Sequence, residues 1–195
     1  MSLSRFAAIA VAAVVVLAGA GHAPAVADEK GHVQKKAEVV ASQTSLAQAI
    51  AAAEQQTGGR AATIKLRQRD GAYLYRVKTV TNDRTVAVIV DAKTGKVVRT
   101  REPGVMTRFV RFFDNDDKED FDRLAASPTT LVAAIAAAEQ QTGGKAIEAE
   151  LEDEHDTARF EIEVAKDNAV QKVVVDPTTG KVLDVGKAKR RGHDR

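Results

Sequence analysis

The sequence predicts an α+β fold made of two homologous modules, each consisting of one helix packed on a small antiparallel sheet. A 16-residue segment that begins at Thr44 returns almost unchanged at Thr129, an offset of 85 residues. The same offset continues without a gap to the end of each copy, which makes the repeat a duplication. Within each copy, helical periodicity gives way to strand alternation and then to a glycine-containing turn.

The repeated segment predicts a short helix in each module, because its apolar residues recur at i, i+3, i+4 and i+7. These residues are Leu46, Ala49, Ile50 and Ala53, and then Leu131, Ala134, Ile135 and Ala138. Ser45 and Gln48 have the spacing of a capping box, whereas Thr130 keeps only the simple N-cap. Gly58 and Gly143 end the helices, since glycine adopts the left-handed conformation without a clash.

After each helix the pattern changes to period two, which predicts half-buried antiparallel strands. The alternating residues are Ala62, Ile64 and Leu66, then Tyr73, Tyr75 and Val77, and in the second copy Phe160, Ile162 and Val164. A third apolar run, Val86 to Val90 or Val173 to Val175, leads into the segments 91–96 and 176–181. Their Asp-x-x-Thr-Gly-Lys sequence predicts a tight hairpin, because Asp accepts turn N–H groups and Gly supplies a positive φ.

The amino terminus has the layout of a signal peptide, residues 1–27. Arg5 precedes an apolar run of about 15 residues that ends at Ala20, and Ala25-Val26-Ala27 supplies an Ala-x-Ala cleavage site. The run is shorter than the roughly 20 residues that span a bilayer. The chain has no Cys, which excludes disulfides, thiolate metal ligands and a lipid-anchored cysteine. We therefore expect a periplasmic or secreted protein with no stable membrane anchor after cleavage.

Three further segments complete the predicted organisation. Residues 28–43 form a flexible amino-terminal segment, and residues 187–195 form a basic tail that is expected to be a disordered solubilising end, with no nucleic-acid partner. Residues 102–128 join the modules and contain four of the six Phe residues. Large apolar side chains are not typical of a flexible linker, so we expect a helical or extended arm that packs on a module. The residues concerned are Phe109, Val110, Phe112, Phe113 and Phe121.

The two copies carry opposite charge. Residues 44–101 contain 11 Lys or Arg against 4 Asp or Glu, a net charge of +7, whereas residues 129–186 contain 5 against 12, a net charge of −7. A module of this size is only marginally stable alone. Pairing of the two modules within the chain, oriented by their opposite potentials, is therefore one expectation. The alternative is that each module meets a different partner or only solvent.

The order of helix, strands and closing hairpin resembles the PepSY family, and so does the Val-x-Val-Asp-x-x-Thr-Gly-Lys-Val pattern that ends each copy. The resemblance covers residues 44–101 and 129–186. It implies a module of the kind found in the propeptides of thermolysin-like metallopeptidases and in free-standing exported bacterial proteins. A protein partner, such as a peptidase, follows from the resemblance and not from any motif of a site.

No catalytic residue and no cofactor is predicted, and the protein is not expected to be an enzyme. After cleavage three His remain, His32, His155 and His193, and no His-Glu-x-x-His occurs. Three Ser remain after cleavage, Ser42, Ser45 and Ser127, and none of them lies in a Gly-x-Ser-x-Gly elbow. Alternate spacing places several carboxylates on a solvent-facing strand surface: Glu148, Glu150, Glu152, Glu161 and Glu163.

Whether metal is bound is left open by the sequence. Asp114, Asp116 and Lys118 occupy the first, third and fifth places of a calcium loop, but Lys118 has the wrong charge and Glu119 stands where glycine is needed. A solvated acidic turn is the favoured interpretation of residues 114–120. Weak carboxylate sites in the acidic second module remain an alternative, since they need no fixed motif.

The leading hypothesis is an exported, non-enzymatic binding module that regulates or inhibits an extracytoplasmic peptidase. A free sheet edge such as the strand from Val86 to Val90 would take up an extended segment of the partner by strand addition. One alternative is a periplasmic envelope-stress or cation-handling protein that binds divalent metal through the acidic second module and residues 114–120. Another is a sensor-like module that docks on a membrane protein.

Overall fold

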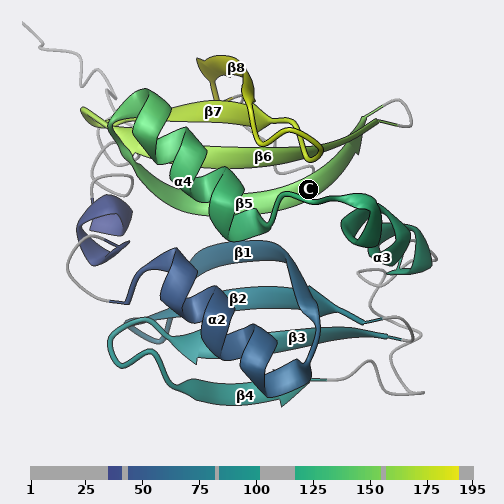
Figure 1. Ribbon diagram of the computed structural model, residues 1–195. Coiled ribbons are helices and arrows are strands. Elements are labelled where there is room, and N and C mark those ends of the chain that lie inside the picture. Colours follow the sequence, from purple (N-terminus) through teal and green to yellow (C-terminus); the bar gives the residue numbers. More distant parts are fainter. Residues whose placement is uncertain (1–34, 41–43, 82–83, 102–116, 155–156, 189–195) are drawn as a thin grey trace, which may run out of the picture.

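A computed structural model describes residues 35–40, 44–81, 84–101, 117–154 and 157–188 (Figure 1). Module 1, residues 44–101, contains α2 (Leu46–Thr57), β1 (Arg60–Arg69), β2 (Ala72–Val80), β3 (Thr85–Asp91) and β4 (Val97–Arg101). The helix α3 (Asp117–Ala126) follows. Module 2, residues 129–186, contains α4 (Leu131–Thr142), β5 (Lys145–Glu154), β6 (Thr157–Lys166), β7 (Ala169–Val175) and β8 (Val182–Lys187).

The strands of both modules form one antiparallel sheet of eight strands in the order β4-β3-β2-β1-β5-β6-β7-β8. The two halves join where β1 pairs with β5, with Ile64 opposite Ala149. These two residues are equivalent in the duplication, so a local two-fold axis passes through this pair. The fold class is as predicted, but the two small sheets are not separate, because each module completes the exposed edge of the other.

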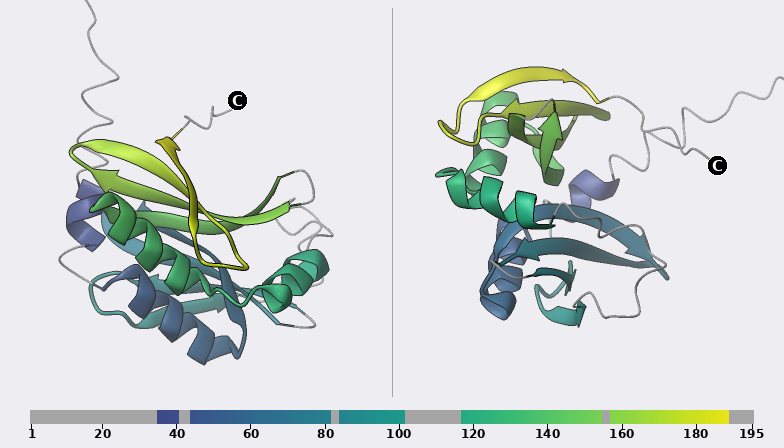
Figure 2. Two further views of the ribbon diagram at one scale, coloured as in Figure 1. Left: turned by 45° about the horizontal axis from the view of Figure 1, so that its top comes forward. Right: turned by 90° about the vertical axis from the view of Figure 1, so that its right-hand side faces the viewer.

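The sheet carries α2 and α4 on the same face, where they lie side by side across the junction (Figures 1 and 2). Their capping follows the sequence prediction: Ser45 and Gln48 form a capping box, Thr130 accepts from the backbone N–H of Ala133, and Gly58 and Gly143 take positive φ.

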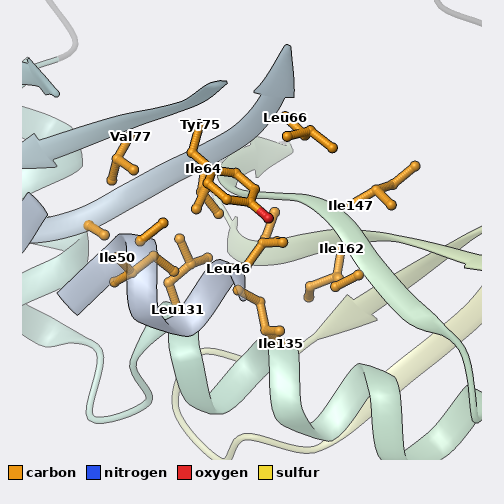
Figure 3. Packing of buried hydrophobic residues seen from close by; sticks show 14 of the residues in the cluster. Leu46, Ile50, Ile64, Leu66, Tyr75, Val77, Leu131, Ile135, Ile147 and Ile162 are labelled. Carbon is orange, nitrogen blue, oxygen red and sulfur yellow. The ribbon is translucent and has the colours of Figure 1, made fainter. Parts of the chain in front are cut away.

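The hydrophobic core is continuous through both modules (Figure 3). Most of it lies between the sheet and the helices α2 and α4, and its largest fully buried side chains include Ile50, Leu66, Tyr75, Phe160 and Ile162. The Tyr75 hydroxyl donates to the carbonyl oxygen of Thr44 at 2.6 Å. Burial raises the pKa of Tyr75 to about 12, because the ionised phenolate would be desolvated.

The repeated Glu-Gln-Gln-Thr-Gly-Gly segment is explained by the turn from helix to strand. Glu54 accepts from the backbone N–H of Ala61 at 2.8 Å, where β1 bulges, and Glu139 does the same for Ala146 at 3.0 Å. A Cβ on Gly144 would lie 2.5 Å from Val164 Cγ1, so the chain has no room there for a larger residue. The repeated Glu-Gln-Gln-Thr-Gly-Gly segment is therefore explained by the structure of the turn.

The second repeated motif closes the β3–β4 and β7–β8 hairpins, as predicted. The Asp91 carboxylate accepts from the backbone N–H groups of Lys93 and Thr94, and Asp176 accepts from those of Thr178 and Thr179. Hydrogen bonds from the side chain and backbone of Thr94 lower the pKa of Asp91. The Thr-Gly-Lys sequence is thus part of a hairpin turn in both modules.

Three predictions about the connecting segments need correction. The segment 28–43 was expected to be flexible, but residues 35–40 form a helix with Val39 and Val40 buried, because these two side chains join the core. Figure 2 shows this helix on the opposite side of the sheet from α2 and α4. Residues 117–120 are helical, so this part of the acidic segment is no turn. Lys187, predicted as the first residue of the basic tail, is instead the last residue of β8.

The arm between the modules is partly described. Helix α3 packs beside β1 and β2, and Leu124 is buried in the core, in keeping with the prediction of a packed arm. The signal-peptide residues 1–27, the Phe109 to Phe113 segment and most of the basic tail lie outside the described residues, as does the side chain of Phe121.

Candidate protein-binding surface

The edges of the eight-stranded sheet are β4 and β8. The prediction that the strand from Val86 to Val90 forms a free edge is wrong, because β3 pairs with β2 on one side and with β4 on the other. The closing hairpin adds one more strand outside it. The candidate sites for strand addition are therefore β4 and β8, each of which has one neighbouring strand among the described residues.

Both edge strands expose apolar side chains. Val98 on β4 is 56% exposed, and its equivalent on β8, Leu183, is 60% exposed; Val185 is 40% exposed. Elsewhere in the described chain the large hydrophobic side chains are at least partly covered. β4 also carries Arg99 and Arg101, both exposed, and charged residues at a sheet edge discourage non-specific pairing with other chains.

The second candidate surface is the side of the sheet opposite α2 and α4. We call it the helix-free face because neither of these two module helices covers it, although the short helix of residues 35–40 lies on this side. Strand register places two rows of side chains across it. One row is Arg99, Ile89, Arg76, Lys65, Glu148, Glu163, Lys172 and Gly186. The other row is Arg101, Ala87, Lys78, Thr63, Glu150, Glu161, Val174 and Asp184. The module 1 half is therefore basic and the module 2 half is mainly acidic.

The two halves meet in a group of ion pairs at the β1–β5 seam. Lys65 Nζ lies 2.7 Å from Glu148 Oε1 and 2.5 Å from Glu150 Oε2. The three side chains are only 19%, 14% and 12% exposed, respectively. Arg67 Nη1 lies 3.0 Å from Glu148 Oε2 but is 49% exposed. The opposite charges of the modules thus act directly at their junction, as one of the two sequence expectations required.

Two carboxylates at the seam have pKa values that move in opposite directions. Burial acts to raise the pKa of Glu148, but the hydrogen bonds and charges of Lys65 and Arg67 outweigh it and the pKa is lowered. For Glu163 burial raises the pKa, and the negative charge of Glu148, its direct cross-strand neighbour, raises it further. Lys36, on the helix of residues 35–40, partly offsets this effect.

A second contact between the modules is made by Arg60, at the start of β1. Its guanidinium donates to the carbonyl oxygens of Leu124, Ser127 and Thr129, the last two at 3.1 and 3.4 Å. In module 1 the carbonyl equivalent to that of Thr129 accepts from the Tyr75 hydroxyl, which Phe160 lacks. Arg60 therefore donates to the Thr129 carbonyl the hydrogen bond that Phe160, the equivalent of Tyr75, cannot donate.

The residues considered in the sequence for catalysis do not come together. Ser45 is the α2 N-cap, and His32, Ser42, His155 and His193 lie outside the described residues. The strand carboxylates do share the helix-free face, but they were expected to be solvent-facing, whereas Glu148, Glu150 and Glu161 are 12–15% exposed because Lys65 and Lys172 cover them.

In the described part of the chain, no group of three or more His, Asp or Glu side chains is arranged to hold a metal ion. Asp114 and Asp116 lie outside that part. Among the same described residues, no helix has the length and hydropathy of a membrane span.

Comparison with known proteins decides the family. Residues 44–101 and 130–185 each match the family model described as the peptidase propeptide and YPEB domain. The chain belongs to the PepSY family. It carries two PepSY modules, and these account for the duplicated part of the sequence. No curated protein matches the chain significantly.

Three solved structures are similar in outline to this tandem PepSY chain. A candidate lipoprotein of Clostridium difficile 630 is 22% identical, with a TM-score of 0.41, 72% of this chain and 90% of that chain covered. The YpmB protein of Bacillus subtilis is 18% identical, with a TM-score of 0.31 and coverages of 75% and 99%. The YpeB C-terminal domain of Bacillus megaterium is 14% identical, with a TM-score of 0.29 and coverages of 75% and 67%.

Proposed function

We propose that this chain is an exported, non-enzymatic binding module that regulates or inhibits an extracytoplasmic peptidase. The observation that carries the proposal is that two PepSY modules, members of a family described through peptidase propeptides, form one sheet with an exposed strand at each end. In this proposal the regulation acts in trans, on a separate enzyme.

The surface available to a partner supports binding by strand addition. A peptide that pairs with a sheet edge gains main-chain hydrogen bonds, and its alternate side chains are selected by the residues beside the edge. Val98 and Leu183 supply apolar contacts of this kind at β4 and β8. The repeated motifs of the modules are occupied with helix ends and turns, so the partner-specific residues are those of the edges and of the helix-free face.

The test is inhibition by the purified protein from Asp28 onward. The assay uses a fluorogenic peptide and a micromolar excess of the protein. It is applied to a thermolysin-like metallopeptidase and to peptidases recovered from the culture supernatant of the producing organism. We expect a concentration-dependent loss of activity of at least one of them. The V98D and L183D variants place a charge at each edge in turn, and the edge that binds is the one whose variant loses inhibition. Unchanged activity of every peptidase would remove the proposal.

A further inference from the structure

The charge difference between the modules is concentrated at equivalent positions. Six pairs related by the 85-residue offset have a basic residue in module 1 and an acidic residue in module 2. These pairs are Lys65/Glu150, Arg67/Glu152, Arg69/Glu154, Arg76/Glu161, Lys78/Glu163 and Arg99/Asp184. Four other pairs keep their sign, namely Glu54/Glu139, Arg60/Lys145, Asp91/Asp176 and Lys96/Lys181.

Position in the fold separates the two groups. Glu54 and Asp91 have equivalents that repeat their backbone hydrogen bonds, so the sign of their charge is fixed by folding. The inverted pairs at Lys65, Arg76, Lys78 and Arg99 lie in the cross-strand rows of the helix-free face. A general drift in composition would not select one face of the sheet.

Ion pairing between β1 and β5 explains the inversion of charge only at positions next to the seam. Lys65 and Arg67 meet the carboxylates of β5 directly, and a second lysine at position 150 would have repelled Lys65 there. β4, however, is separated from β1 by two strands, roughly 14 Å at about 4.8 Å per strand spacing. The charges of Arg99 and Arg101 therefore do not contribute to the seam pairs and need another explanation.

The two edges of this face expose charges of opposite sign. Near the seam, Glu148 and Glu150 pair with Lys65, and Glu161 lies 2.5 Å from Lys172. At the β4 edge the exposed charges are Arg99 and Arg101, and at the β8 edge the exposed charge in the rows is Asp184. An acidic segment is therefore attracted to the β4 edge of module 1 and repelled from the β8 edge of module 2.

We propose that the helix-free face of module 1 docks an acidic, extended segment of a partner polypeptide, and that module 2 braces module 1 without contacting that segment. The proposal deepens the binding function proposed above by assigning the contact to one module and one chemistry. Arginine suits this role because its planar guanidinium binds carboxylates bidentately and is always charged.

The spacing of the arginines favours a polypeptide over a lipid surface or a polyphosphate. Arg99 and Arg101 are two residues apart on β4, about 6.8 Å, which is the spacing of alternate side chains in an added strand. Ile89 lies between Arg76 and Arg99 in the first row, where it offers apolar contact to a polypeptide. A segment with carboxylates at alternate positions would therefore meet both arginines along the exposed β4 edge.

The experiment uses the whole protein from Asp28 onward and two fluorescein-labelled decapeptides of equal composition, one alternating Glu and Thr and one with five Glu followed by five Thr. We expect the alternating peptide to bind at least fivefold more tightly, with an affinity that falls as salt is raised. The R99T/R101T variant should weaken its binding at least tenfold. The matched R84A/K93T variant also removes two positive charges from module 1, but outside the cross-strand rows, and should change binding less than threefold.

Urea midpoints equal to that of the unsubstituted protein show that both variants keep the fold. If the two variants lose the same affinity for the alternating peptide, binding depends on net charge alone and the proposal is wrong. If the two peptides bind equally well, the partner segment is not recognised as an extended strand with alternate carboxylates, and the proposal is also wrong. Binding of phosphatidylglycerol vesicles or inorganic polyphosphate that R99T/R101T abolishes, without peptide binding, would overturn the polypeptide partner. Because no peptidase is present, failure here leaves the inhibition assay to decide the proposed function separately.

Discussion

Replacement of Lys65 by methionine tests the seam between the two modules. The substitution keeps an unbranched, apolar stem of similar length but removes the ammonium that contacts Glu148 and Glu150 at 2.7 and 2.5 Å. Both carboxylates are about seven-eighths buried, so they would be left poorly solvated, with Arg67 still paired to Glu148.

The expected loss follows from the partial burial of this group. Removing one partner of a fully buried ion pair costs about 3–5 kcal/mol, and exposed pairs contribute about 0–1 kcal/mol. The seam lies between these limits, and the half-exposed Arg67 retains part of the compensation. We therefore expect K65M to lower the free energy of unfolding by about 2–3 kcal/mol at pH 7 and low salt.

The assay is equilibrium unfolding in urea followed by circular dichroism, with K93M as the control, because Lys93 lies exposed in a hairpin turn. K93M should change the free energy of unfolding by less than about 0.5 kcal/mol. In the K65M/E150M double variant the loss should be smaller than the sum of the single losses by at least about 1 kcal/mol. A K65M protein within 0.5 kcal/mol of the unsubstituted one, or fully additive losses, would refute the reasoning.

Three further predictions concern single positions. E163Q should raise stability at pH 7 by about 0.2–1 kcal/mol, because like charges opposite each other on neighbouring strands repel. Since the pKa of Glu163 is raised in the folded state, its protonation favours folding as pH falls, so urea titrations should show this gain disappearing by pH 4. Y75F should cost about 1 kcal/mol through the lost bond to Thr44. It should also remove the loss of stability between pH 10 and 12 that follows from a folded-state pKa of about 12, and an unchanged alkaline profile would contradict this. G144A should lower the thermal midpoint, at a cost of about 1–3 kcal/mol, and no shift would show that β6 yields to the added methyl group.

Within each module the sequence was sufficient to predict the fold. Helix ends, strand alternation and the hairpin turns depend on neighbouring residues, and the duplication gave two independent views of each signal. The predicted roles of Ser45, Asp91 and Gly58 are confirmed in the structure for this reason.

The arrangement of the modules could be predicted only in part. Opposite net charges suggested pairing, but charge is not directional enough to select β1 and β5 as the strands that meet. The choice of edge strand was wrong because β4, the second strand of the predicted closing hairpin, pairs with β3 on its outer side and becomes the edge itself. The Arg60 contacts with Leu124 and Thr129 link residues 64 and 69 positions apart, and no local pattern records them.

The candidate surface was also incompletely predicted. The net charge of a whole module predicts only opposite potentials, whereas the informative feature is the inversion of sign at equivalent positions on one face. Pairwise comparison of the two copies would have found it, but assigning positions such as Arg76 and Arg99 to a common row requires the strand register.

The central structural claim is that the two PepSY modules share one continuous sheet, and amide hydrogen exchange of the intact protein tests it most directly. In a continuous sheet β1 and β5 are interior strands, so the amides of residues 63–65 and 148–150 should exchange as slowly as those of β2 and β6. The amides of β4 and β8 should exchange faster. If residues 63–65 and 148–150 instead exchange as fast as β4 and β8, the modules are independent and the account of the seam is wrong.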